Sequence, residues 1–323
     1  MIAKRLAFAL LIGLLLGSAG SARAGSATQW PTRPIRAILP FAPGTGADVV
    51  SRLVFNQVSI QLGQQIVVEN RGGAGGTIGS AVVAKAEPDG YTILGQSSSH
   101  AIAPALYPNM SYDVARDFAA VASYGMMPTA LLIAPSKGIA TVGQFVAAAK
   151  AKPPTFASAG VGSTTHLTAE RFRLSAGFEA IHVPFKGGGF RPEVAAGRVD
   201  FAFSPIAVAV PDIRDGRLLA LAVSGRARVS ALPDVPTTLE AGYPNSDYML
   251  WFGMLVPAQT PRPIVERLHL ETMKALETPA LRDKLAGFDV VPMPLKPAEF
   301  DAFIKDEIAT QGALAKAAGL KPN

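Results

Sequence analysis

The sequence predicts an α/β protein whose two lobes are joined by two extended crossings. Short apolar runs alternate with amphipathic helical segments along most of the chain, a pattern typical of βαβ units and parallel sheets. Two longer apolar runs interrupt this alternation, one at 119–135 and one at 251–256. We interpret them as the crossings, the first broken at 125–128. The predicted lobes are therefore 25–127 together with 250–323, and 128–249.

The N-terminus has the pattern of a secretory signal peptide. Lys4 and Arg5 precede an apolar stretch from residue 6 to 16, and small residues lead to an Ala-Arg-Ala sequence that ends at Ala24. The apolar stretch is shorter than the ~20 residues that a membrane span needs. We expect export and cleavage after Ala24, so residues 1–24 are left out of the fold. An uncleaved anchor is the alternative.

Within the first lobe, apolar runs and helical periodicity define the elements in turn. Gly63 ends the first helix, and the run at 66–68 has the continuous apolar character of a buried parallel strand. The expected elements are strands at 35–39, 66–68 and 91–94 and helices from about 47 to 62 and from 77 to 86.

The second lobe repeats this alternation. Pro153 and Pro154 end its first helix. The expected elements are helices at 142–150 and from about 166 to 174, and strands at 155–157, 181–183, 199–203 and 218–223. The remainder after the second crossing is mostly helical, with one short strand at 290–291.

The composition excludes several kinds of partner and site. The net charge of +6 includes three basic residues of the first 24, and the other basic residues are scattered, which argues against nucleic acid and against a membrane-surface patch. The absence of cysteine rules out disulfides, thiolate metal sites and a cysteine nucleophile. The four histidines lack metal-ligand spacing. We therefore expect no metal and no cofactor.

Five predicted strands end in loops of small or polar residues. If both sheets are parallel, the carboxyl ends of these strands can face one cleft. Such a cleft offers backbone amides and hydroxyls but few fixed charges, which suits a small anionic or polar ligand. The loops are 41–48, 71–76, 95–100, 158–166 and 186–189.

The loop from Pro40 to Asp48 is the strongest of these candidates. Gly44 and Gly46 let a ligand approach the backbone, and the amides and dipole of the following helix favour an anion. The competing interpretation is an ordinary strand-to-helix turn capped by Thr45. We expect Asp48 both to suit the first helical turn and to contact ligand. Lys186, the cation of another loop, either attracts an anion or is a solvated surface lysine.

Nucleotide and hydrolase motifs fit poorly. The glycines at 72–79 give no G-x-G-x-x-G frame, and a backbone turn followed by close helix packing accounts for them better. His100 and His166 each lie beside Ser or Thr at a strand end, which could provide a Ser–His pair. A structural histidine that bonds a neighbouring loop is the favoured interpretation, and His182 and His269 are also interpreted as structural.

Blocks along nearly the whole mature chain match a known family in sequence and in order. They include Pro40–Asp48, 68–76, 84–92, 104–107, 157–160, 166–167, 182–187, 231–237 and 251–253. On these blocks the chain resembles the periplasmic receptors of tripartite tricarboxylate transporters, called Bug receptors. The match is specific for the family and unspecific for the ligand.

The resemblance implies a periplasmic-binding-protein fold of the type II "Venus flytrap" kind. Such a receptor, expected here as a monomer in the periplasm, closes on a small carboxylated solute and delivers it to an inner-membrane permease. The solute is a di- or tricarboxylate, an aromatic acid or a similar compound. The residues implied as ligand contacts are Phe41, Ala42, Pro43, Gly44, Thr45, Gly46, Ala47, Asp48, Ser97, Ser98, Ser99, His100, Gly160, Val161, Gly162, Ser163, Thr164, Thr165, His166, Lys186, Gly187, Ser204 and Pro205.

Three departures from the family pattern bear on the ligand. The first loop commonly has Pro-Pro-Gly-Gly, where Ala42 and Thr45 intervene. An Asp or Asn commonly follows the strand that ends at Phe203, where Ser204 stands, which disfavours an amino-acid ligand. Phe190 and Arg191 are bulkier than usual, and we expect either to line the pocket.

Two other functions stay open at this point. One is a receptor that presents its ligand to a sensor kinase, which would have the same fold and cleft. The other is an exported hydrolase that uses Ser99 or Ser163 with His100 or His166. The hydrolase predicts turnover of a substrate, whereas a binding protein predicts none.

Overall fold

The computed structural model describes residues 30–322. The predicted signal peptide at 1–24 lies outside these residues. Among residues 30–322, no helix combines the length and the apolar character that crossing a membrane requires.

The first sheet region is built around three parallel strands in the order β2-β1-β3. They are β1 (Ile35–Leu39), β2 (Ile66–Asn70) and β3 (Thr92–Ser97). β9 (Met249–Pro257) pairs antiparallel with β3, and the first part of β4 (Phe118–Ile133) pairs antiparallel with β9. The region is therefore mixed rather than purely parallel, because β9 runs against its neighbours.

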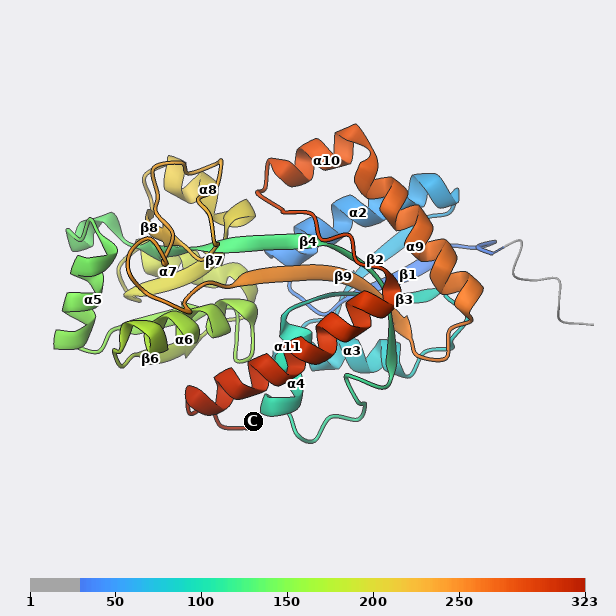
Figure 1. Ribbon diagram of the computed structural model, residues 1–323, viewed down its shortest axis with the longest axis horizontal. Coiled ribbons are helices and arrows are strands. Elements are labelled where there is room, and N and C mark those ends of the chain that lie inside the picture. The colour runs from blue at the N-terminus through green and yellow to red at the C-terminus, as the bar shows by residue number, and fades with distance from the viewer. Residues whose placement is uncertain (1–29, 323) are drawn as a thin grey trace, which may run out of the picture. The chain divides into compact units, whose positions relative to one another are not determined.

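The second sheet region begins where β4 leaves β9. From Thr129 onward β4 pairs antiparallel with β7 (Phe201–Pro205) and with β8 (Leu219–Val223). β5 (Thr155–Ser158) lies between β7 and β6 (Ile181–Pro184) and is parallel to both. β4 and β9 run side by side, and β4 continues from the first region into the second (Figure 1).

Helices cover both faces of the first sheet region (Figure 1). The apolar face of α2, which includes Val50, Val54 and Val58, is buried, and α9 contacts both α2 and β4. On the other face Trp251 of β9 packs edge-on against Phe300 of α11, with ring centroids 5.3 Å apart. The helices around this region are α2 (Gly46–Leu62), α3 (Thr77–Ala84), α4 (Ser99–Leu106), α9 (Arg262–Glu277), α10 (Pro279–Ala286) and α11 (Pro297–Ala317).

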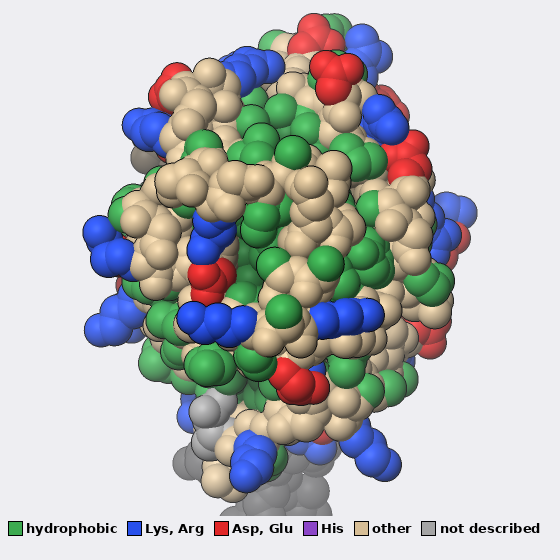
Figure 2. Space-filling view, turned by 90° about the vertical axis from the view of Figure 1, so that its left-hand side faces the viewer, with side chains coloured by type: hydrophobic (Ala, Val, Ile, Leu, Met, Phe, Trp, Pro, Cys, Tyr) green, Lys and Arg blue, Asp and Glu red, His purple; other side chains and the backbone are tan. Residues whose placement is uncertain are grey.

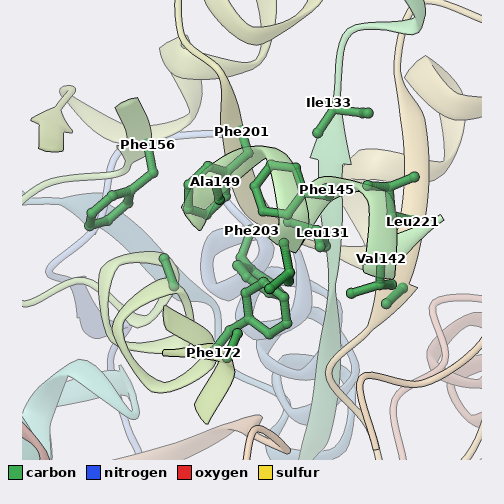
Figure 3. Packing of buried hydrophobic residues seen from close by; sticks show 14 of the residues in the cluster. Leu131, Ile133, Val142, Phe145, Ala149, Phe156, Phe172, Phe201, Phe203 and Leu221 are labelled. Atoms are coloured by element: carbon green, nitrogen blue, oxygen red, sulfur yellow. The ribbon is translucent and has the colours of Figure 1, made fainter. Parts of the chain in front are cut away.

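The second sheet region is also covered on both faces, because side chains alternate along its strands. Leu131 and Ile133 of β4 pack with α5 and α6, whereas Ala130 and Leu132 pack with α7 and α8. Figure 3 shows the first of these clusters, where phenylalanines of α5, α6, β5 and β7 converge. The helices are α5 (Val142–Ala151), α6 (Thr164–Ala176), α7 (Arg191–Ala195) and α8 (Ile206–Arg214), with short 3₁₀ segments η1 (Ala74–Gly76), η2 (Pro135–Lys137) and η3 (Gly187–Phe190).

Several predicted elements need correction. β2 is an edge strand with Val67 52% exposed, because β1 rather than β2 occupies the middle of the parallel group. β4 is continuous through 125–128, where a break was predicted, and accommodates its irregularity by register shifts after Ala120 and Ser123. The predicted strand at 290–291 is only an isolated bridge from Val291 to Met126.

The distribution of charged side chains can be seen on one face of the protein. On the face shown in Figure 2, Lys and Arg side chains are interspersed with Asp and Glu. This agrees with the scattered basic residues of the sequence, and it favours a solvated exterior over a binding face for a polyanion.

Candidate functional site

The two sheet regions share one strand topology. From β1 the chain passes through α2 to β2 on one side and then through α3 to β3 on the other side. From β5 it passes through α6 to β6 and then through α7 to β7 in the same way. In open α/β sheets, ligands bind beyond the carboxyl end of the strand at which the order reverses. The loops at these two points are 40–45 and 159–163.

Both loops border a single cavity of about 740 Å³. All five loops predicted to face one cleft contribute to its wall, together with the end of β7, two residues of β9 and Tyr107. The lining residues are Pro40, Phe41, Ala42, Thr45, Gly46, Ala47, Gly72, Gly73, Ala74, Gly75, Gly76, Ser97, Ser99, Tyr107, Ala159, Gly160, Val161, Ser163, Thr164, Thr165, Phe185, Lys186, Gly187, Pro205, Leu250 and Phe252.

The N-terminus of α2 forms one side of the cavity. The Thr45 hydroxyl caps the helix, since it accepts from the Asp48 amide at 3.4 Å and donates to the Ala42 carbonyl at 3.0 Å. The first amides of a helix have no intrahelical acceptor. Within residues 30–322 the amides of Gly46 and Ala47 donate no hydrogen bond to the protein. They remain available to an anion in the cavity.

The N-terminus of α6 forms a second side of the cavity in the same manner. The Ser163 hydroxyl accepts from the His166 amide at 3.3 Å, and the Thr165 hydroxyl accepts from the Ala159 amide at 2.9 Å. In the described part of the chain the amides of Thr164 and Thr165 also have no protein acceptor. Two helix N-termini, one from each sheet region, therefore offer amides to the same space.

Fixed charge in this space is sparse. Among the lining residues, all of which lie in the described chain, only Lys186 carries a charged side chain, and it is exposed. The cavity thus combines two positive helix ends and one lysine, an arrangement that favours negative charge.

Asp48 lies behind this wall rather than on it. Its carboxylate is buried and accepts hydrogen bonds from the Gly44 amide at 2.9 Å, from Arg52 Nε at 2.9 Å and from Asn70 Nδ2 at 2.8 Å. Asn70 also donates to the Phe41 carbonyl at 3.0 Å. Asp48 therefore holds the first loop in place, and its oxygens are occupied by the protein.

The structure brings most of the predicted contact residues to the cavity and leaves the others outside its lining. Those that line it are Phe41, Ala42, Thr45, Gly46, Ala47, Ser97, Ser99, Gly160, Val161, Ser163, Thr164, Thr165, Lys186, Gly187 and Pro205. Those outside the lining are Pro43, Gly44, Asp48, Ser98, His100, Gly162, His166 and Ser204. Ligand contact by the residues of either group stays a prediction.

His166 holds the loop at 159–163 through its ring. Its ring stacks on His182 with centroids 3.9 Å apart, and Nδ1 accepts from the Gly162 amide at 3.2 Å. Burial, with smaller contributions from the charges of His182 and Arg173, lowers the pKa of His166 to about 3. Burial likewise lowers the pKa of His182 to about 4. Both rings are therefore neutral at physiological pH.

The serine–histidine pairs proposed for a hydrolase have a different geometry. In the described chain Ser163 is bonded to the backbone amide of His166 rather than to its ring, and the His100 ring lies 3.3 Å from Gln96. Ser158 does contact the His182 ring, at 2.6 Å, but Ser158 is fully buried and outside the cavity lining. A substrate in the cavity would not reach that hydroxyl.

Sequence reasoning missed part of the wall. The loop at 71–76 was expected to face the cleft and does line the cavity, but its glycines were explained by a turn and helix packing and none was named as a ligand contact. Tyr107, Phe185, Leu250 and Phe252 carry no local signal, because ordinary apolar residues become lining only when distant segments meet. Their positions at strand or helix ends next to the candidate loops were the one available indication.

Phe190 and Arg191 do not line this cavity, contrary to expectation. Phe190 is buried in the core of the second sheet region, and Arg191 forms an ion pair with Asp212, with Nε 2.8 Å from the carboxylate. Both face away because they begin α7 and pack it against α8.

The site and fold agree with the comparison to known proteins. The model of the tripartite tricarboxylate transporter family receptors matches residues 50–320. This chain belongs to that family. It is similar to the protein BugT of Bordetella pertussis, with 35% identity over 318 residues, which cover 96% of this chain and 97% of BugT.

Solved structures of the family superpose closely. A Rhodopseudomonas palustris protein solved with adipate is 31% identical, with a TM-score of 0.86 over 91% of this chain and 100% of that one. The protein MatC of the same species, solved with bound malate, is 30% identical, with a TM-score of 0.83 over 88% and 99%. The fold is thus that of the periplasmic binding proteins of this family, which are solute-binding receptors.

Proposed function

We propose that this receptor captures a small carboxylate in its cavity and delivers it to a tripartite tricarboxylate permease of the inner membrane. The observation that carries the proposal is the meeting of two helix N-termini, those of α2 and α6, in a cavity whose only charged lining side chain in the described protein is Lys186. Free amides and a helix dipole stabilise a carboxylate from both sides.

The lining also favours particular carboxylates. An amino-acid ligand needs an acceptor for its ammonium group, yet the nearby carboxylate of Asp48 is occupied by three protein donors. Phe185, Leu250 and Phe252 add apolar surface beyond the helix ends. The preferred ligand is therefore a carboxylic acid, such as a dicarboxylate, whose middle is apolar and carries no amino group. The adipate bound by a relative has this character.

Binding would close two lobes, 25–127 with 250–323 and 128–249, around the ligand. β4 and β9 are the strands through which the chain passes between the regions, so bending near Pro128 and Met249 would move one set of loops toward the other. The residues that line the cavity are proposed as ligand contacts, and export follows from the predicted signal peptide.

The test is calorimetric titration of residues 25–323, unfolded and refolded to remove carried-over ligand. We expect adipate to bind most tightly, malate more weakly and aspartate not at all. Unfolding measurements provide a second check, because a ligand at a free concentration of 100 times its Kd adds about 2.7 kcal/mol to the free energy of unfolding. If no carboxylate binds, the proposal fails, and if the bound acid is consumed, the hydrolase becomes the better explanation.

Two further measurements sharpen the assignment. Lys186→Gln slows association of adipate at low salt, while the exposed Lys152→Gln does not, and the difference vanishes at high salt because exposed charges are screened. Uptake of adipate that persists without the partner permease would favour a sensory receptor over a transport receptor.

A further inference from the structure

Tyr107 joins the two sheet regions at the cavity wall. It directly follows α4, which contacts β3 of the first region, and its hydroxyl donates to the Val161 carbonyl at 3.1 Å. Val161 belongs to the loop that precedes α6 in the second region. Both residues line the cavity. Burial raises the pKa of the Tyr107 hydroxyl above its usual value, so it stays protonated and can donate at neutral pH.

The Tyr107 ring lies in a notch between two glycines. A methyl group at Gly75 would lie 2.8 Å from Cε2 of the ring and 3.2 Å from the Val161 carbonyl oxygen. A methyl group at Gly162 would lie 3.1 Å from Leu106 and 3.6 Å from Cε2 of Tyr107. A side chain at Gly75 would therefore clash with the Tyr107 ring and crowd the Val161 carbonyl, and one at Gly162 would crowd Leu106. The absence of side chains at these two glycines, one in each region, thus lets the Tyr107 ring lie against both regions.

An apolar cluster lies beside this bond and gives the contact between the regions no direction. Ile102 and Leu106 of α4 pack with Leu167 of α6 and Ala315 of α11, and Tyr107 and Val161 border this cluster. Apolar contact depends on buried area rather than on orientation. The hydroxyl–carbonyl bond, by contrast, requires one relative placement of α4 and the loop before α6.

We propose that Tyr107 is a positioning residue that holds loop 159–163, and with it the N-terminal amides of α6, against the first sheet region around a bound carboxylate. The bond forms when the regions are together and breaks when they separate. It therefore slows ligand release and leaves the encounter with the ligand unchanged. The inference rests on the proposed function in its choice of a carboxylate as ligand. The contact between Tyr107 and Val161 does not depend on that function.

The matched variants are Tyr107→Phe, which removes one hydroxyl and keeps the ring, and Tyr243→Phe, a tyrosine outside the cavity lining. The first readout is amide hydrogen exchange of residues 159–163 in the ligand-free receptor. We expect Tyr107→Phe to accelerate it about fivefold, the factor that one neutral hydrogen bond of ordinary strength represents. Tyr243→Phe leaves it unchanged.

The second readout is stopped-flow dissociation of adipate. Tyr107→Phe raises the dissociation rate about fivefold with an unchanged association rate. Unchanged exchange at 159–163 overturns the proposal, even where overall stability falls, because Tyr107 would then be a packing residue. Faster exchange with unaltered adipate release overturns its role in retention. If neither adipate nor malate binds, the proposed function fails, while the exchange result still decides whether Tyr107 positions the loop.

Discussion

The carboxylate of Asp48 accepts the amide of Gly44 at 2.9 Å, so the first turn of α2 reaches back and fixes the loop that precedes it. The same carboxylate binds Arg52 and Asn70. Asp48 was predicted from the sequence both to suit the first helical turn and to contact ligand. The structure places it in that turn and outside the cavity lining, and ligand contact stays a prediction. Through its hydrogen bonds Asp48 holds the loop whose residues line the cavity.

Asp48→Ala should weaken both the fold and ligand binding. It removes the acceptor of the Gly44 amide and one of the two acceptors of Asn70 Nδ2, and hydrogen bonds to a charged group are worth about 1.5–3 kcal/mol. We expect urea unfolding to show a loss of about 2 kcal/mol and titration to show a weaker affinity for adipate. Asp283→Ala is the control, because Asp283 forms an exposed ion pair with Arg282 and its loss should change stability by less than about 1 kcal/mol. Equal effects of the two substitutions would contradict this role.

Gly187→Ala should prevent the closest approach of two loops. A methyl group at Gly187 would lie 2.6 Å from the Ala42 Cβ, and Gly187 has a φ of +65°, which disfavours alanine. We expect at least a tenfold rise in the Kd for adipate, since about 1.4 kcal/mol corresponds to that factor. Gly189→Ala is the matched control two residues on, where a methyl group would meet nothing within 4 Å. If Gly187→Ala and the control have the same Kd, the loops that contain Ala42 and Gly187 do not approach each other in the bound state.

Acid should destabilise the receptor through its stacked histidines. His166 and His182 have pKa values of about 3 and about 4 in the fold, against 6.5 for an ordinary histidine. The unfolded chain therefore binds more protons below pH 6.5, and the free energy of unfolding falls as the pH drops from 6.5 toward each folded pKa. The slope is about 1.4 kcal/mol per pH unit for each ring. The buried Glu170, whose pKa is raised by burial, opposes this loss at the acid end.

His166→Asn tests that assignment. The asparagine oxygen can still accept the Gly162 amide that Nδ1 accepts now, but it cannot take up a proton. Urea unfolding between pH 6.5 and 4 should show a slope shallower by about 1.4 kcal/mol per pH unit. A curve parallel to that of the unsubstituted protein would place the acid sensitivity elsewhere.

Local sequence patterns predicted the parts of the site that a single segment forms. They did not predict the parts that distant segments form together. The loops at 41–48 and 158–166 were recognisable because glycine, a capping hydroxyl and a helix start lie within a few residues of one another. Tyr107 and Leu250 were not recognisable, because they line the cavity only through the meeting of α4 and β9 with loops far away in the chain.

The sequence by itself determined the alternation of strands and helices and the family, since apolar periodicity and the residues of short loops are read within a few positions of one another. Only the tertiary structure decided which residues face the ligand space. The order β2-β1-β3 put β2 at an edge, the turn of α2 directed Asp48 away from the cavity, and the approach of two regions put Tyr107 against Val161. These outcomes depend on contacts between distant segments, which no local pattern of residues contains.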